Sequence, residues 1–238
     1  MSKSNNPLNI VVKNQFFPDG LNEQQVYRYW CQMKYNLLPL IEGKEIFFYI
    51  APDTNQTVVR RHLRENELYK ITTTTYEKIL NGRILGIVST VPSSTDIGIV
   101  DIDINPTDGV ADESEFNLAK EAVADTFDFL ARNYGLLLFY TGKNGFHIHV
   151  KLPKKLRPEN IKEILYKQLN DSPLSKRYTL LSKRDKKTPN IDLSINKNRG
   201  GYITQYSLNK IGLPCALINR EALNQFKREK LVSLVENP

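Results

Sequence analysis

The feature that most constrains the fold is a run of strict two-residue alternation over residues 96–104, with the sequence DIGIVDIDI. Such alternation is typical of a β-strand with one face in the core and the other facing solvent or a ligand. The apolar members of the alternation point to the core: Val100, Ile102 and Ile104. Asp101 and Asp103 then leave the opposite face together. The chain must therefore build a sheet around a strand that carries two acids on one side.

The rest of the chain mixes helical and strand patterns. Apolar residues at helical spacing predict helices over residues 22–39, 116–134, 158–169 and 220–235. We expect Asn22 and Gln25 to cap the first helix and Gly135 to end the second. β-prone runs predict strands over 45–50, 136–140, 146–150, 190–195 and 202–206, whereas 57–80 stays open. These patterns predict one α+β unit behind a polar tail of residues 1–15.

Charge narrows the choice of partners. The chain has 33 Lys and Arg against 26 Asp and Glu, and twelve of the basic residues lie within residues 151–187 beside four acids. Such clustering favours a phosphate backbone, with Arg60 and Arg61 as further contacts, although a solvated Lys-rich surface would look the same. Cys31 and Cys215 are too far apart in sequence for a zinc motif, and no apolar run could span a membrane. We expect a cytoplasmic protein without zinc.

Three acids suggest a metal site. Two neighbouring carboxylates such as Asp101 and Asp103 repel each other unless a cation lies between them, and Mg²⁺ or Mn²⁺ prefers such oxygen ligands. Asp192, in NIDLSI, is a third acid flanked by apolar residues on a predicted strand. Two-metal phosphoryl transfer needs a set of this kind. The alternative is an exposed edge strand that carries acids without binding a metal.

A polar turn lies between these acids in the sequence. Residues 141–145 (TGKNG) offer backbone N–H groups, a hydroxyl, an amide and a cation, which together suit a phosphate. His147 and His149 follow on one face of the next predicted strand. For His149, a hydrogen-bonded structural role is the simpler interpretation.

The series IVDID, TGKNGFHIHV and NIDLS resembles the three motifs of the archaeo-eukaryotic primase superfamily, in the same order. FPDGLNEQQVYRYW, LLPLIEGKEI and NKNRGGYITQYSLN resemble the polymerase domain of bacterial end-joining ligase D. GFHIHV and SLNKIGLPC resemble the small catalytic subunit of archaeal primase. The resemblance covers residues 16–225 and is specific only in combination.

This resemblance implies a primase-polymerase domain over residues 16–238, with an RRM-like antiparallel sheet bearing the acids against a second α/β lobe. It implies a metal-dependent, template-directed nucleotidyltransferase that uses a DNA template or primer and NTPs or dNTPs. The implied metal ligands are Asp101, Asp103 and Asp192, and His147 would contact the nucleotide's phosphates. The other implied nucleotide-site residues are Thr141, Gly142, Lys143, Asn144, Gly145, Arg199, Ser207 and Asn209.

Two departures from the family pattern limit what the resemblance implies. Asn209 stands where the ligase-associated polymerases usually carry Arg, which puts part of their phosphate grip in doubt. The Cys/His zinc insertion of primase small subunits is absent. Sugar preference, initiation without a primer and the pathway (end joining, plasmid or viral replication, damage tolerance or CRISPR adaptation) stay open, as do accessory proteins.

Two other functions compete with this one. His147-Ile148-His149 is a His-hydrophobic-His triplet of the kind that binds one metal in rolling-circle nicking enzymes, and Tyr166 would be the nucleophile. A non-catalytic RRM-like module would instead stack bases on strand aromatics. Its candidate residues are Phe47, Tyr49, Tyr202 and Tyr206.

Overall fold

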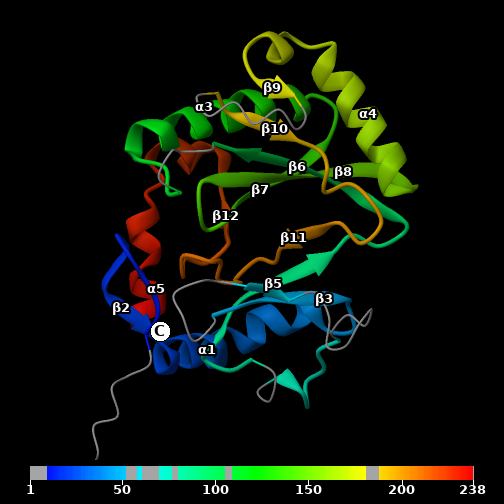
Figure 1. Cartoon of the computed structure of the whole chain (residues 1–238). Coiled ribbons are helices and arrows are strands. Elements are labelled where there is room, and N and C mark those ends of the chain that lie inside the picture. The colour runs from blue at the N-terminus through cyan, green and yellow to red at the C-terminus, as the bar shows by residue number, and fades with distance from the viewer. Residues whose placement is uncertain are drawn as a thin grey trace, which may run out of the picture. The chain divides into compact units, whose positions relative to one another are not determined.

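The computed structural model describes residues 10–51, 58–60, 70–76, 80–104, 109–180 and 188–237, with 58–60 as backbone alone. The chain divides into two units (Figure 1). Unit 1 comprises Met1–Ser89, Ile203–Cys215 and Lys227–Pro238, and unit 2 comprises Thr90–Tyr202 and Ala216–Phe226.

Unit 1 is built on β-strands and one long helix. β3 (Ile46–Ile50) pairs antiparallel with β4 (Val58–Arg60) and with β5 (Ile84–Thr90). β11 (Gly201–Ile203), within which the chain passes from unit 2 to unit 1, completes the order β11-β5-β3-β4. β1 (Ile10–Asn14) and β2 (Phe17–Asn22) form a separate hairpin.

Helix α1 (Glu23–Ile41) follows β2 and confirms the first predicted helix. Asn22 and Gln25 form the expected capping box, each side chain bonding the other's backbone N–H. The buried indole of Trp30 donates to the Ile84 carbonyl at 2.7 Å. This bond ties the apolar face of α1 to the first residue of β5.

Unit 2 contains a six-stranded sheet in the order β12-β7-β8-β6-β10-β9. Its central strands are β6 (Thr95–Asp103), β7 (Gly135–Tyr140) and β8 (Gly145–Leu156), and both β6 and β7 pair antiparallel with β8. β10 (Asn190–Asp192) pairs antiparallel with β6 and parallel with β9 (Thr179–Leu180), and β12 (Ala216–Ile218) pairs with β7. The predicted strand around residues 96–104 and the hairpin after it are confirmed.

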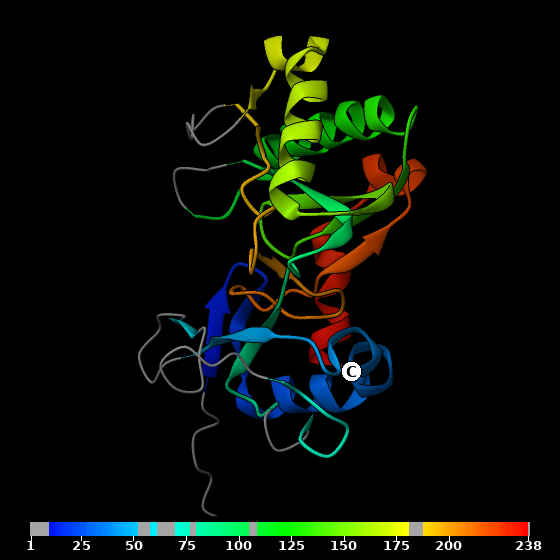
Figure 2. The same ribbon diagram turned by 90° about the vertical axis from the view of Figure 1, so that its right-hand side faces the viewer.

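Helices α3 (Glu113–Leu130) and α4 (Pro158–Asn170) lie on the same face of this sheet (Figures 1 and 2). Phe116 of α3 stacks on Phe146 of β8 with ring centroids 5.4 Å apart. A Cβ added at Gly98 of β6 would meet Ile161 and Leu165 of α4, each at 2.8 Å, so this glycine allows the helix to approach closely. Side chains alternate between the two faces of a strand, so every second residue of β6 counted from Gly98, and of β8 counted from Phe146, faces the helices.

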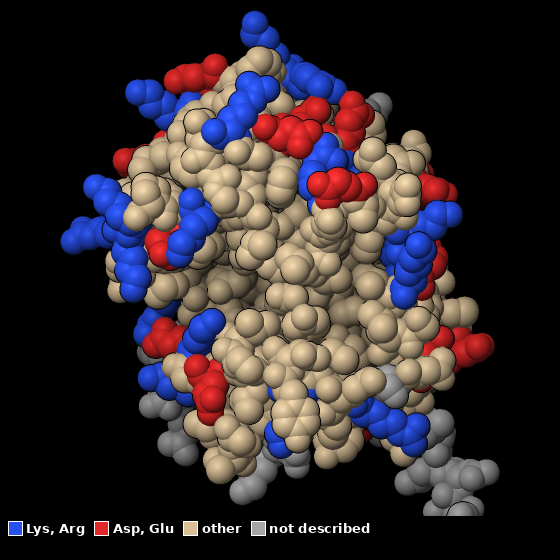
Figure 3. Space-filling model, turned by 180° about the vertical axis from the view of Figure 1, so that it is seen from behind, with Lys and Arg blue, Asp and Glu red and all other residues tan. Residues whose placement is uncertain are grey.

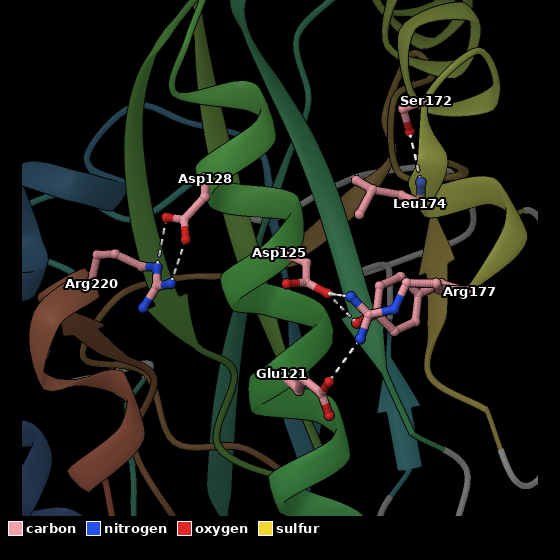
Figure 4. A network of polar contacts seen from close by, with 8 residues as sticks. Glu121, Asp125, Asp128, Ser172, Leu174, Arg177 and Arg220 are labelled. Atoms are coloured by element: carbon pink, nitrogen blue, oxygen red, sulfur yellow. Dashed lines mark hydrogen bonds and ion pairs between the residues drawn. The ribbon is translucent and has the colours of Figure 1, made fainter.

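Polar contacts fasten the edges of the sheet to the outer side of α3 (Figure 4). The Arg177 guanidinium, after a short 3₁₀ helix η1 (Pro173–Lys176), bonds Glu121 at 2.7 Å and Asp125 at 2.6 Å. Arg220 makes a two-bond pair with Asp128 at 3.0 and 2.6 Å. The first contact holds the segment that enters β9, the strand paired with β10.

The prediction of one helix over residues 220–235 is wrong. The segment forms 3₁₀ helices η2 (Arg220–Gln225) and η3 (Arg228–Leu231) and a short α5 (Ser233–Glu236). Phe226 packs on Tyr140 of unit 2 with ring centroids 5.0 Å apart, whereas the chain from Lys227 onward belongs to unit 1. The helical run is thus broken at the position where the chain passes from unit 2 to unit 1.

Other boundaries also differ from the predictions. Gly135 does not cap α3, which ends at Leu130 with Ala131 as its cap, and instead opens β7. Within 190–195 and 202–206 the strands are only β10 and β11. Strands β1, β2, β5, β9 and β12 had no predicted counterpart, and β4 lies in the segment 57–80 that was left open. β1 lies inside the expected polar tail. In the part of the chain that the structure describes, no helix is long and apolar enough to cross a membrane.

Candidate functional site

Backbone register brings the predicted acids and His147 onto one face of the sheet in unit 2. Asp101 of β6 lies opposite His147 of β8 on one side and opposite Asp192 of β10 on the other. Asp103 lies opposite Gly145 and Asn190 in the same two pairings. Directly paired residues share a face. This face is turned away from α3 and α4, and we call it the acid face.

His147 contacts the first of these acids. Its Nε2 lies 3.3 Å from Asp101 Oδ1, and its ring is only 5% exposed. Its buried Nδ1 has no hydrogen-bond partner among the described residues. A buried nitrogen without a partner is costly in a folded protein, so this atom is a candidate for contact with a ligand.

Asp103 lies against a residue that must be glycine. A Cβ added at Gly145 would meet Asp103 Oδ1 at 2.0 Å and the Ile102 carbonyl at 2.4 Å. The glycine that ends the 141–145 turn thus gives the Asp103 carboxylate its space. The position of the Asp103 carboxylate therefore depends on the glycine at the end of the turn.

Asp192 is held by its own turn. Its Oδ1 accepts from the Ser194 backbone N–H at 2.6 Å, and its Oδ2 accepts from the Ser194 hydroxyl at 2.9 Å. A carboxylate offers about four acceptor positions, so these two bonds leave capacity on both oxygens. The carboxylate is also half-buried, which limits its rotation.

The chemistry of these residues suits a hard divalent cation. Asp101 and Asp192 lie in direct register and Asp103 lies on the same face, so the three carboxylates offer oxygen donors. Asn190, opposite Asp103, has a buried side-chain oxygen with no partner among the described residues. Among the described residues, no three His, Cys, Asp or Glu side chains are gathered closely enough to hold a metal ion. The case for a metal site therefore rests on the strand register and on the oxygen donors of these side chains.

The 141–145 turn is held by its own bonds. Thr141 Oγ1 donates to the Gly145 carbonyl at 3.0 Å, and Gly142 takes a left-handed φ of 88°. The buried Asn144 accepts from the Ala111 N–H at 2.9 Å and donates to the Gly109 carbonyl at 3.0 Å. Tyr140 donates its hydroxyl proton to the Lys143 carbonyl. The Asn144 amide thus joins the turn to the chain that follows β6.

The basic turn after β10 is fixed by a residue that the sequence analysis missed. Asn196 accepts from the Ile99 N–H at 2.8 Å and donates to the Ile99 carbonyl at 2.6 Å, as a strand backbone would. A Cβ at Gly200 would meet the Ile195 carbonyl at 1.9 Å, and Arg199 has a left-handed φ of 58°. These bonds hold Arg199, which is exposed, in the turn beside β6.

Ser207 and Asn209 belong to unit 1, whereas the strands of the acid face belong to unit 2. The Ser207 hydroxyl is fully buried, accepts from the Ile87 N–H at 2.6 Å and donates to the Leu208 carbonyl at 2.9 Å. Asn209 Oδ1 accepts from the Ile211 N–H at 2.9 Å. These bonds serve the local backbone, and the predicted nucleotide contacts of both residues stay predictions.

His149 continues the acid face next to His147. It packs between Phe139, with centroids 4.5 Å apart, and Tyr202, in an edge-on contact at 5.5 Å. Burial, and then the neighbouring His147, lower the pKa of His149 to about 3. The ring is therefore neutral at physiological pH, in keeping with the structural role expected for it.

The structure separates the residues required by the nicking alternative. The α4 face that carries Ile161 and Leu165 packs against β6 at Gly98, on the face opposite His147 and His149. Tyr166, on the same helix, is 37% exposed. The proposed nucleophile therefore lies on a helix that covers the other face of the sheet from the histidine pair.

Basic side chains are only partly available for a phosphate backbone. Lys151 pairs with Asp96, whereas Lys154, Lys155 and Arg157 are exposed near the end of β8. On the side shown in Figure 3, basic and acidic side chains are interspersed. Several predicted contacts lie outside the described residues: Arg61, Lys183, Arg184, Lys186, Lys187 and the side chain of Arg60.

The fold is similar to that of the polymerase domain of Mycobacterium tuberculosis ligase D, whose structure was solved in complex with DNA. The TM-score is 0.68 at 13% sequence identity, over 97% of this chain and 94% of the other. The resemblance to ligase D stated from the sequence is thus confirmed at the level of the fold. No family model and no curated protein sequence matches this chain.

Proposed function

We propose that this protein is a metal-dependent, template-directed nucleotidyltransferase that adds nucleotides from NTPs or dNTPs to a 3′-hydroxyl. The observation that carries the proposal is the direct register of Asp192, Asp101 and His147 across three adjacent strands, with Asp103 on the same face. A structural sheet gains nothing from Asp101 directly opposite Asp192 with a third acid on the same face, since like charges opposite each other are destabilising. The shared fold supports the same reaction class.

Each residue has a role in this proposal. Asp101, Asp103 and Asp192 would hold Mg²⁺ or Mn²⁺, which when bound neutralises charge on the triphosphate and favours loss of the 3′-hydroxyl proton. In the reaction, the 3′-oxygen bonds to the α-phosphorus, the bond to the β-phosphate oxygen breaks, and pyrophosphate leaves. His147, whose buried Nδ1 has no described partner, would orient the phosphates from the neighbouring strand. Lys143 and Arg199 would add positive charge.

The DNA would be held by exposed cations near the end of β8. Lys154, Lys155 and Arg157 are solvent-exposed, as a phosphate-backbone contact requires. Their combined removal should weaken template binding and flatten its dependence on salt, because fewer counterions are released. If the protein were instead a non-catalytic RRM-like binding module, its binding to DNA would survive removal of the three acids.

The test is incorporation of labelled nucleotides on a primed DNA template with Mn²⁺ or Mg²⁺. Asp101→Asn, Asp103→Asn and Asp192→Asn each keep the shape of the side chain and remove its charge. Each should lose at least about 10³-fold in rate, since a catalytic metal contributes several kcal/mol. The matched control is Asp128→Asn on the outer side of α3, which pairs with Arg220 and should keep wild-type activity.

Two outcomes would contradict the proposal. One is wild-type protein that incorporates no nucleotide with any metal or nucleotide tried, and the other is full activity in all three aspartate variants. Repeating the assay without a primer, on single-stranded DNA with mixed NTPs and dNTPs, decides whether the protein also initiates chains.

A further inference from the structure

Asn190 is a buried polar residue on the acid face to which the sequence analysis gave no role. It is 5% exposed, and its Oδ1 has no hydrogen-bond partner among the described residues. It lies directly opposite Asp103 in the β10–β6 pairing and two residues before Asp192. Its side chain therefore leaves the sheet on the same side as both acids.

An unsatisfied buried oxygen has an energetic cost. Leaving a buried acceptor without a donor costs about 1–3 kcal/mol, and an apolar residue of similar shape would avoid that cost. An amide at position 190 is thus the less stable choice unless a ligand satisfies it.

The position of Asn190 distinguishes it from the other unsatisfied oxygens. Thr126 Oγ1 and Gln168 Oε1 are also buried without described partners, but they lie on α3 and α4. Those helices cover the opposite face of the sheet. Asn190 combines an unsatisfied oxygen with two carboxylates as neighbours, and amide oxygens are common ligands of hard cations.

We propose that Asn190 Oδ1 is an oxygen ligand for the divalent cation held at Asp103 and Asp192. The inference rests on the proposed function, because it assumes that the acid face binds a cation. It adds a neutral ligand to the three acids. A neutral ligand leaves more of the cation's charge available to phosphates than a fourth carboxylate would.

The experiment measures Mn²⁺ binding directly, by the loss of the free-ion electron paramagnetic resonance signal, on full-length protein without nucleotide. Asn190→Leu should weaken Mn²⁺ binding about tenfold, as loss of one supporting group does in other metal sites. Asn190→Asp keeps an oxygen but no N–H donor and should bind at least as tightly as wild type. Urea unfolding of each variant without metal, where Asn190→Leu should be no less stable, excludes a folding defect.

Thr126→Val is the matched control, because it also removes a buried oxygen that lacks a described partner. It should leave Mn²⁺ affinity unchanged. Asp101→Asn tests the proposed function separately and should abolish tight binding. If Asp101→Asn loses Mn²⁺ and Asn190→Leu does not, or if Asn190→Asp binds as weakly as Asn190→Leu, the inference is wrong while the cation site stands. If Asp101→Asn binds like wild type, the cation site itself is refuted, and the inference with it.

Discussion

The two faces of the six-stranded sheet are built from alternate residues of the same strands, yet they are satisfied to different degrees. On the helix-covered face, Ile102, Phe146 and Ile148 are fully buried against apolar neighbours. On the acid face, His147 and Asn190 are buried with polar atoms that find no partner among the described residues. Packing thus stabilises one face, while the other keeps buried polar groups that the described residues leave without partners.

The largest expected loss of stability comes from a substitution on the helix-covered face. Phe146→Ala removes a ring that stacks on Phe116 and should lower the free energy of unfolding by about 3–5 kcal/mol. Leu137→Ala, at a β7 position that is 54% exposed, should change it by about 0.5 kcal/mol or less. Urea denaturation followed by circular dichroism measures both. Similar losses in the two variants would contradict the contrast between buried and exposed positions.

A second change tests the contact between the turn and the acid. Gly145→Ala adds a Cβ that would meet Asp103 Oδ1 at 2.0 Å, so we expect a loss of about 1–3 kcal/mol in stability. It should also impair nucleotide incorporation, because Asp103 must move. Gly135→Ala is the matched control, since its Cβ would meet only the Lys151 Cβ at 3.8 Å. Equal stability in the two alanine variants would show that the close approach is not tight.

The acid face, unlike the helix-covered face, should make the stability of the protein depend on pH through His149. His149 stays neutral in the folded protein because its pKa is lowered to about 3, whereas an unfolded histidine titrates near pH 6.5. Between these values the unfolded chain binds the extra proton, so stability is full above pH 6.5 and falls as the pH drops, by at most about 1.4 kcal/mol per pH unit. His147 and Tyr202 face the ring.

His149→Phe should reduce this slope, because Phe cannot titrate and suits the contacts with Phe139 and Tyr202. Urea unfolding at pH 7 and pH 5 compares the variant with wild type. An unchanged difference between the two pH values would show that His149 is protonated freely in the folded state.

The smallest effect is expected on the outer side of α3. Asp125, whose side chain is 30% exposed, accepts from the Tyr178 hydroxyl and from Arg177, whose side chain is 52% exposed (Figure 4). Exposed ion pairs contribute about 0–1 kcal/mol, so Asp125→Asn should lower stability by less than 1 kcal/mol and less still in 1 M salt. A loss as large as that of Phe146→Ala would mean that this network, and not the packed face, holds the edge strands.

Sequence alone predicted the parts of the fold that depend on local periodicity. The alternation over residues 96–104 placed Asp101 and Asp103 on one face, and the capping box at Asn22 marked the start of α1. The prediction of a C-terminal helix was wrong although the apolar residues do recur at helical spacing. Phe226 packs in unit 2, whereas Arg228 packs in unit 1. Strand β5 was missed because a strand buried along nearly its whole length shows no alternation.

The candidate site was predicted to a similar extent. Strand parity and motif order identified Asp101, His147 and Asp192, which the register then brought side by side. Asn196 was missed because its two bonds to Ile99 depend on a contact between residues 97 positions apart in sequence. Asn190 could have been found, since it precedes Asp192 by two residues on a predicted strand and so shares its face.

The most direct test of the account is a crystal structure of the protein grown with Mn²⁺ and a non-hydrolysable nucleoside triphosphate. Anomalous scattering locates the manganese without reference to any expected site. We predict a peak on the acid face within coordination distance of Asp101 and Asp103, with the triphosphate on the same side as His147. Manganese found only elsewhere, with His147 still in contact with Asp101 and the acid face filled by solvent, would contradict the central claim.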